Sequence, residues 1–293
     1  MNALCRLLLA NLLLAAALAL HAETLQIVDD AGRVVRLAIP VQRIVTLAPH
    51  LAELVFAAGA GNRLVGASAH SDHPPAVAKL PVVGGPGRLD LERILLLKPD
   101  LVLAWGSGGQ QLDVARLTAL GIPVLVTEPQ RLEDIARHIE LIGRLAGTGY
   151  EAMRAAFQVR EALRGLQNRY AGRAPVRVFY EIWHTPLMTV NGRHIISEAI
   201  TLCGGRNVFA DLAPLTPTVT MEALLAADPE VIVVSGERAQ RDRLLAQWRG
   251  ASRPVAAARG HIYFADADLM HRATPRMIDG IRQLCQDLEQ ARH

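Results

Sequence analysis

Residues 91–106, with the sequence LERILLLKPDLVLAWG, are repeated without a gap as residues 221–236, MEALLAADPEVIVVSG. A Glu, a Leu, a Pro and a Gly coincide, and apolar residues match apolar residues at most other positions. Each copy predicts a short helix, a turn at the proline and a buried strand. A repeated unit of this kind indicates two similar halves, and the alternative is a chance likeness between two unrelated segments.

Short runs rich in Val, Ile and Leu recur on both sides of the middle of the chain, each followed by a segment with helical spacing. Strands that alternate with helices are typical of a parallel sheet covered on both faces. We therefore predict an α/β fold of two Rossmann-like lobes. The predicted strands are Ile44–Leu47, Leu101–Trp105, Val124–Thr127, Val176–Ile182, Val231–Ser235 and Ile262–Phe264.

Between the two groups of strands, residues 133–170 have helical spacing that is broken once, at residues 147–149. The part from about 150 to 170 contains no proline and predicts one helix of about 30 Å at 1.5 Å per residue. We expect this single long helix to join an N-terminal lobe, residues 23–131, to a C-terminal lobe, residues 175–293, within a helical segment of residues 132–174.

Residues 1–22 have the pattern of a signal peptide. Arg6 precedes an apolar run from Leu7 to Leu20 that is interrupted only by Asn11, and cleavage is expected near Ala22. Cys5 precedes this run, where a lipoprotein cysteine would not lie, so no lipid anchor is predicted. No later run is apolar enough to cross a membrane.

The formal net charge is only +3, and arginines are mixed with acidic residues, so a nucleic-acid surface is not indicated. Removal of the signal peptide leaves Cys203 and Cys285 as an even pair in an oxidising compartment. A disulfide is favoured over two buried thiols. In the chain-entropy model, a bridge over this length contributes about 4 kcal/mol.

In open parallel sheets, ligands bind beyond the carboxyl ends of the strands. The loops expected there combine aromatic, imidazole, thioether and charged side chains, which suits a large amphipathic ligand better than a sugar or an ion. These loops are 49–50, 68–73, 84–88, 105–109, 183–188, 236–238 and 266–272.

From about residue 43 to the end, the chain resembles the periplasmic cobalamin-binding proteins, within the group of iron-siderophore, haem and cobalamin receptors that have a rigid helical linker. The motifs that carry the resemblance are SDHPP at 71–75, LERI at 91–94 with KPDLV at 98–102, LCGG at 202–205 with Asn207 and Phe209, and Arg272-Ala273 with Pro275-Arg276.

The resemblance implies that Trp105, Asp268 and Arg272 contact the ligand, with the indole on an apolar ring face and the charged groups on side-chain amides. Trp183 could supply an aromatic ring from a neighbouring place, or could simply plug the lobe surface. His70 could ligate cobalt, or could face solvent. The family's other aromatic pocket positions are occupied here by His70, Pro86, Met188 and Thr216.

The resemblance also implies that Glu92 and Glu222, which coincide in the repeat, dock onto arginines of the transporter. An alternative role for each is local, because a Glu in the first turn of a helix interacts favourably with the helix dipole. Asp90 and Thr220 are the expected caps of the two helices.

The resulting hypothesis is a monomeric periplasmic binding protein that captures cobalamin or a related corrinoid and delivers it to an inner-membrane ABC permease. It would have no cofactor, and the corrinoid would be its transported ligand. Haem, an iron siderophore or a metal ion is the alternative ligand within the same fold. An enzyme is not predicted, because the sequence contains no Gly-x-Ser-x-Gly, His-Glu-x-x-His or Walker lysine motif.

Overall fold

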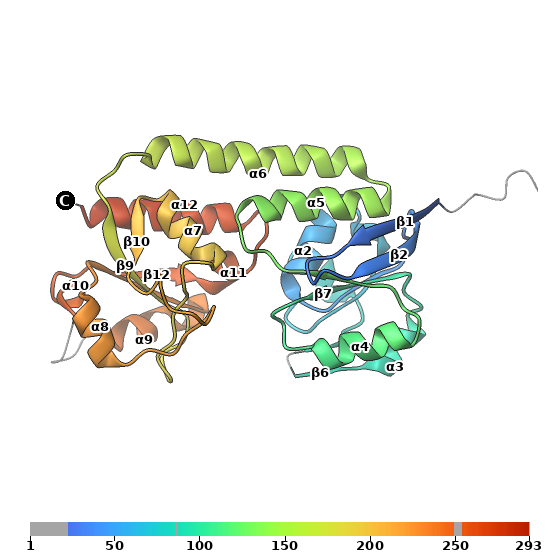
Figure 1. The fold of residues 1–293 in the computed structure, drawn as a ribbon, viewed down its shortest axis with the longest axis horizontal. Coiled ribbons are helices and arrows are strands. Elements are labelled where there is room, and N and C mark those ends of the chain that lie inside the picture. The colour runs from blue at the N-terminus through green and yellow to red at the C-terminus, as the bar shows by residue number, and fades with distance from the viewer. Residues whose placement is uncertain (1–22, 86, 249–253, 293) are drawn as a thin grey trace, which may run out of the picture.

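The computed structural model describes residues 23–85, 87–248 and 254–292, and it contains two α/β lobes beside a long helix, α6 (Gly149–Tyr170) (Figure 1). The expected signal peptide lies outside the described residues. Among the helices that are described, none combines the length and apolar character needed to cross a membrane.

The N-terminal lobe is built on a parallel sheet with the strand order β4-β3-β7-β8. Its strands are β3 (Ile44–Thr46), β4 (Leu64–Ala67), β7 (Leu101–Trp105) and β8 (Val124–Thr127). An antiparallel hairpin of β1 (Glu23–Val28) and β2 (Val34–Ile39) precedes this sheet, and a short pair is formed by β5 (Gly84–Gly85) and β6 (Arg88–Leu89).

The C-terminal lobe has a parallel sheet with the strand order β10-β9-β11-β12. Its strands are β9 (Val176–Glu181), β10 (Gly205–Asn207), β11 (Val231–Gly236) and β12 (Ile262–Asp266). In both lobes the second strand along the chain lies outside the first, and the third and fourth follow on the other side. The two lobes therefore share one topology, which confirms the predicted fold class.

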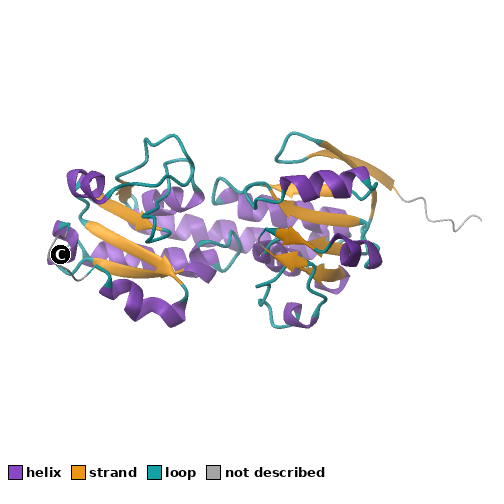
Figure 2. Cartoon of the chain, turned by 90° about the horizontal axis from the view of Figure 1, so that it is seen from below, coloured by secondary structure: helices purple, strands orange, loops and turns teal. Residues whose placement is uncertain are grey.

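Helices cover the faces of both sheets (Figure 2). Those of the N-terminal half are α2 (Pro49–Ala57), α3 (Leu91–Leu96), α4 (Gln111–Ala119) and α5 (Glu133–Ala146), with 3-10 turns η1 (Gly61–Arg63) and η2 (Val77–Lys79). Those of the C-terminal half are α7 (Ile195–Leu202), α8 (Met221–Ala227), α9 (Arg241–Ala246), α10 (Val255–Ala258), α11 (Ala267–Met270) and α12 (Met277–Gln290), with η3 (Arg238–Gln240).

Helix α6 is supported along its length, because α5 packs under one half and α12 under the other (Figure 1). Its inner face carries small and aliphatic side chains, including the buried Ala152, Ala156 and Val159. Gly143 of α5 faces Ala152, and a Cβ atom at Gly143 would collide with it. One continuous apolar core extends from the N-terminal lobe through this face into the C-terminal lobe, so the linker is stiff.

The repeated segments form the predicted units, α3 with β7 and α8 with β11. In each lobe an arginine at the start of the first strand of the sheet, Arg43 just before β3 and Arg177 within β9, holds the turn of the unit. Arg43 donates side-chain hydrogen bonds of 2.9 and 2.7 Å to the Leu97 carbonyl, and Arg177 donates bonds of 3.0 and 2.8 Å to the Asp228 carbonyl. The two copies of the repeat therefore share their structure as well as their sequence pattern.

The disulfide predicted from the sequence is present. Cys203, at the end of α7, is bonded to Cys285 of α12, and the two residues are 82 positions apart. Because α12 also packs on α6, the bond ties α7 to the helix pair that supports the C-terminal lobe.

Candidate ligand-binding site between the lobes

A cavity of about 350 Å³, hereafter the central cavity, lies between the lobes at the carboxyl ends of the strands. The N-terminal lobe contributes His50 and Trp105, the loop after β8 crosses the cavity, and the C-terminal lobe supplies the rest. The lining residues are His50, Trp105, Glu128, Pro129, Gln130, Ile182, Trp183, Met188, Arg193, His194, Ile195, Ile196, Leu215, Thr216, Met270, His271 and Ala273.

The N-terminal wall is an aromatic pair. Trp105 is the last residue of β7 and His50 lies in the first turn of α2, and their rings meet edge to face with centroids 5.4 Å apart. Trp105 Nε1 and His50 Nε2 are buried and have no hydrogen-bond partner among the described residues. The wall therefore presents mainly ring surface to a ligand.

Three imidazoles of the cavity are held uncharged at neutral pH. Burial lowers the pKa of His50 to about 3, and the nearby charges of His138 and Arg272 act in the same direction. Burial also lowers the pKa values of His194 and His271 to about 4. A largely apolar lining with uncharged imidazoles, in which Glu128 and Arg193 are the charged residues, suits a large flat amphipathic ligand better than a small anion or a bare cation.

The opposite wall comes from the loop after β9. Trp183 and Met188 are joined by a β-bridge, and Met188 also bridges to Thr218, which places Thr216 beside them on the cavity. The Trp183 indole donates a hydrogen bond of 2.8 Å to the Thr185 carbonyl. The side chain is nevertheless 62% exposed, so a large apolar surface faces the cleft.

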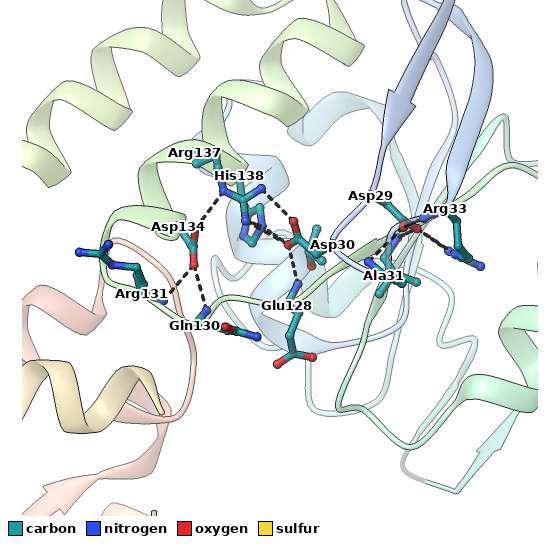
Figure 3. A network of polar contacts seen from close by, with 12 residues as sticks. Asp29, Asp30, Ala31, Arg33, Glu128, Gln130, Arg131, Asp134, Arg137 and His138 are labelled. Carbon is teal, nitrogen blue, oxygen red and sulfur yellow. Dashed lines mark hydrogen bonds and ion pairs between the residues drawn. The ribbon is translucent and has the colours of Figure 1, made fainter. Parts of the chain in front are cut away.

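A polar network holds the loop after β8, which contributes Glu128 to Gln130 to the cavity (Figure 3). Asp30 accepts hydrogen bonds from the Glu128 amide at 2.7 Å and from Arg137 at 2.9 and 3.1 Å, and it lies 2.8 Å from His138 Nε2. Asp134 accepts from the Gln130 amide at 2.9 Å. These contacts tie the β1–β2 turn to α5 and fix the loop between them.

Arg272 forms a cross-lobe cluster with acidic side chains at the edge of the cleft. It lies 3.0 Å from Glu53 and 2.7 Å from Asp72 in the N-terminal lobe, and 2.7 Å from Asp268 in its own lobe. Arg276 also reaches Glu53, at 3.0 Å. The Glu53 side chain is only 3% exposed, so these ion pairs act with little screening by water.

Four of the eight ligand-contact residues proposed from the sequence share the central cavity: Trp105, Trp183, Met188 and Thr216. Asp268 and Arg272 do not line it, because the acidic residues of the cross-lobe cluster hold the guanidinium. His70 is exposed, with φ of +63°, and its carbonyl accepts from Arg272 at 3.3 Å. Pro86 lies outside the described residues.

Sequence reasoning missed His194, Gln130 and the cross-lobe role of Glu53. His194 caps α7, accepting from the Ile196 amide at 3.2 Å, and a histidine at a helix start gave no signal of a cavity. Glu53 follows His50 by three positions, which places both on one face of a helix that begins after a strand. That spacing is the signal that could have drawn attention to Glu53.

Glu92 and Glu222 occupy equivalent exposed positions in the first turns of α3 and α8. Asp90 caps α3 by accepting from the Arg93 amide at 2.9 Å, and Thr220 caps α8 by accepting from the Ala223 amide at 3.2 Å. Hydrogen bonds from its own backbone amide and from Thr220 lower the pKa of Glu222. The local role expected of a helix-start glutamate is therefore present at Glu222.

Two similar lobes on a stiff helix, with a ligand-sized cavity between them, define a solute-binding protein. A family model described as periplasmic binding protein matches residues 44–269, and the chain belongs to that family. In the part of the chain that the structure describes, no three His, Cys, Asp or Glu side chains are grouped as a metal site.

Within this family, the chain is 35% identical to a vitamin B12-binding protein of Vibrio parahaemolyticus over 250 residues, which is 85% of this chain and 90% of the relative. The solved structure of the periplasmic vitamin B12 binding protein BtuF of Vibrio cholerae is similar with a TM-score of 0.79 and 34% identity, covering 86% of this chain and 98% of that one. The periplasmic heme-binding protein RhuT of Roseiflexus is similar with a TM-score of 0.74 and 25% identity, covering 86% and 99%.

Proposed function

We propose that this protein binds cobalamin, or a related corrinoid, in the periplasm and delivers it to an inner-membrane ABC transporter. The observation that carries the proposal is the central cavity, which is lined by aromatic side chains of both lobes, Trp105 and Trp183, together with uncharged imidazoles. A corrin ring is a flat macrocycle edged with amide groups, and such a ligand gains from ring burial and from neutral hydrogen-bonding groups. The vitamin B12-binding relatives support the same ligand.

Haem is the competing ligand, since one similar structure is a heme-binding protein. A tyrosinate is one of the protein ligands of haem iron, beside His, Cys and Met. Tyr180 is fully buried in β9, its hydroxyl lies 3.4 Å from His271 Nε2, and burial raises its pKa well above the ordinary value. Tyr180 does not line the central cavity, so no tyrosinate is offered there. His50, His194 and His271 do line it, and the corrinoid is favoured over haem by the higher identity of the vitamin B12-binding relatives.

Calorimetry on the mature protein tests the ligand directly. Cyanocobalamin should bind with a 1:1 stoichiometry, while haem and a ferric siderophore, at the same concentrations, should give no saturable heat. Trp105→Ala should weaken cyanocobalamin binding at least about tenfold, because a large ring contact is lost. Tight haem binding without cobalamin binding would replace the proposal with the alternative.

Asp268 and Arg272 enter the proposal as groups for corrin side-chain amides, which requires Arg272 to give up at least one of its carboxylate partners. His70, whose carbonyl accepts a hydrogen bond from Arg272, is proposed as a cobalt ligand. Hydroxocobalamin should then shift its visible spectrum on binding, and His70→Ala should abolish the shift while the protein still binds. An unchanged spectrum in the wild-type protein would remove this role from His70.

Glu92 and Glu222 are proposed to contact the transporter, one from each lobe. The double variant Glu92→Ala, Glu222→Ala should keep its affinity for cyanocobalamin in solution and lose delivery to permease-containing vesicles. Two glutamates of α6 serve as the control in the double variant Glu151→Ala, Glu161→Ala; Glu151 is exposed, and Glu161 is partly exposed and pairs with Arg164 at 2.7 Å. Loss of affinity in solution would place Glu92 and Glu222 in ligand binding instead.

A further inference from the structure

A second cavity, hereafter the side cavity, opens beside the central one in the C-terminal lobe. Its volume is about 420 Å³, and it shares Ile182, Trp183 and His271 with the central cavity. It lies at the carboxyl ends of β9 and β11, where the loops of a parallel sheet bind ligands. Trp183 therefore lines two neighbouring cavities.

The floor of the side cavity is built from buried polar groups. Glu181 is 1% exposed at its side chain, and its carboxylate accepts from the Trp248 indole at 2.7 Å and lies 3.0 Å from His184 Nδ1. Burial raises the pKa of Glu181, with His184 and Trp248 opposing the shift. This floor can exchange hydrogen bonds with a hydroxyl or an amide of a ligand.

The rim of the side cavity carries an oriented cation. Gln240 donates to Glu237 at 3.1 Å and accepts from Arg243 at 2.8 Å, so an amide holds the guanidinium in place. Among the described residues, no carboxylate lies within ion-pair distance of Arg243. An arginine of this kind can make charge-assisted hydrogen bonds to a phosphate group.

The central cavity is small for a complete cobalamin. At about 350 Å³, it lies near the lower end of the range of about 300–1,000 Å³ for ligand pockets. A complete cobalamin carries, besides its corrin ring, a nucleotide tail made of a phosphodiester, a ribose and a flat aromatic base. A ligand of that size needs room next to the space that covers the ring.

We propose that the side cavity receives the nucleotide tail of the corrinoid, with Arg243 on the phosphodiester, Glu181 and His184 facing the ribose, and Trp183 with Leu244 against the base. This inference rests on the proposed function and extends it. It makes the protein selective for complete cobalamins over corrinoids that lack the tail. Gln240 is a positioning residue that orients Arg243.

The experiment compares cyanocobalamin with dicyanocobinamide, which has the corrin ring but no nucleotide tail, by calorimetry at fixed ionic strength. The wild-type protein should bind cyanocobalamin about tenfold or more tightly than the cobinamide, as expected for a charge-assisted hydrogen bond to phosphate. Arg243→Ala should remove most of this preference by weakening cyanocobalamin alone. Gln240→Leu should change the preference in the same direction, by less.

Arg241→Ala is the matched control. Arg241 lies two positions away on α9 but lines a different cavity, beside β12 and α12, so it removes the same charge without touching the side cavity. Equal losses for Arg241→Ala and Arg243→Ala would show a long-range effect of charge and would overturn the inference. An unchanged preference in Arg243→Ala, or an equal loss for both ligands, would overturn it too.

The proposed function and this inference fail in different ways. If the wild-type protein binds neither corrinoid, the proposed function is wrong and the inference falls with it. If it binds both corrinoids with the same affinity, the proposed function stands, and the nucleotide tail lies outside the side cavity.

Discussion

The two lobes have the same strand order and the same helix-turn-strand unit, whose turn is held by an arginine. The surfaces that they present to the cleft nevertheless differ. The N-terminal lobe gives the central cavity His50, Trp105 and a loop held by Asp30, whereas the C-terminal lobe gives most of the lining and all of the side cavity. The duplicated part is the framework behind the strands. The loops at the carboxyl ends of the strands differ between the lobes. Loops tolerate sequence change better than the sheet and helices that support them, so these loops determine which ligand is bound.

The lobes also differ in how their edges are tied. In the N-terminal lobe, the β1–β2 turn caps the edge strand β8, since the Val126 amide donates to Asp29 at 3.1 Å and the Asp30 amide donates to the Val126 carbonyl at 3.1 Å. In the C-terminal lobe, a disulfide ties α7 to α12. Hydrogen bonds from a turn thus fix the edge strand of one lobe, whereas a covalent bond joins two helices of the other.

Removal of the disulfide should have the largest effect and should separate the lobes. The double variant Cys203→Ala, Cys285→Ala should lose about 4 kcal/mol, because a bond that closes a loop of 82 residues restricts the unfolded chain. Hydrogen exchange under mild denaturant should show the loss mainly in α7, α12 and the C-terminal sheet. Equal loss of protection in both lobes would show that the shared core makes them one cooperative unit.

The cross-lobe cluster should give the next largest effect. Glu53→Gln should lower the free energy of unfolding by about 3 kcal/mol, because two arginines then lose a buried carboxylate partner. Asp72→Asn is the control, since Asp72 contacts the same Arg272 but is 62% exposed and should cost less than about 1 kcal/mol. Denaturation in urea measures both. Similar effects would mean that burial does not set the strength of the cluster.

The framework could be predicted from the sequence because its signals are local. Hydrophobic periodicity located β7, β8, β9, β11 and β12 within a residue or two, and the gap-free repeat predicted two lobes of one kind. The short strands β4 and β10, and the β1–β2 hairpin, were missed. The strands β4 and β10 have the sequences LVGA and GRN, which contain glycine and polar residues in place of a run of Val, Ile and Leu, so pairing with neighbours decides their structure.

The site was harder to predict because it depends on how the lobes face each other. Trp105, Trp183, Met188 and Thr216, of which all but Trp183 were proposed from the family resemblance, share a cavity. The partners of Arg272 could not be read from the chain, because Glu53 precedes it by 219 positions and meets it only through packing of the two lobes. Contacts between residues so far apart in the sequence leave no periodic pattern from which they could be predicted.

Protonation of the cavity imidazoles should give a smaller effect that is visible in the pH dependence of stability. The pKa of His50 is about 3 in the folded protein and about 6.5 when exposed, so its contribution is complete above pH 6.5 and is lost as the pH falls toward 3. Between pH 7 and pH 5, the wild-type protein should lose about 2 kcal/mol that His50→Phe does not lose. Parallel denaturation curves of the two proteins across this range would contradict the buried, neutral state of His50.

The smallest predicted change in stability comes from substitution of the equivalent arginines, Arg43 and Arg177, and it measures how similar the two lobes are. Arg43→Ala and Arg177→Ala each remove paired side-chain hydrogen bonds to the carbonyl of a turn, and both arginines are exposed. Each should cost about 1 kcal/mol, as measured by urea denaturation, and the two costs should agree within about 0.5 kcal/mol. Arg36→Ala, at an exposed position on β2, should change stability by less than about 0.5 kcal/mol and controls for the loss of charge. A clearly larger cost at Arg177, which also pairs with the Asp228 carboxylate at 3.2 Å, would mean that the C-terminal unit has strengthened this contact since the duplication, so that the framework has diverged along with the loops.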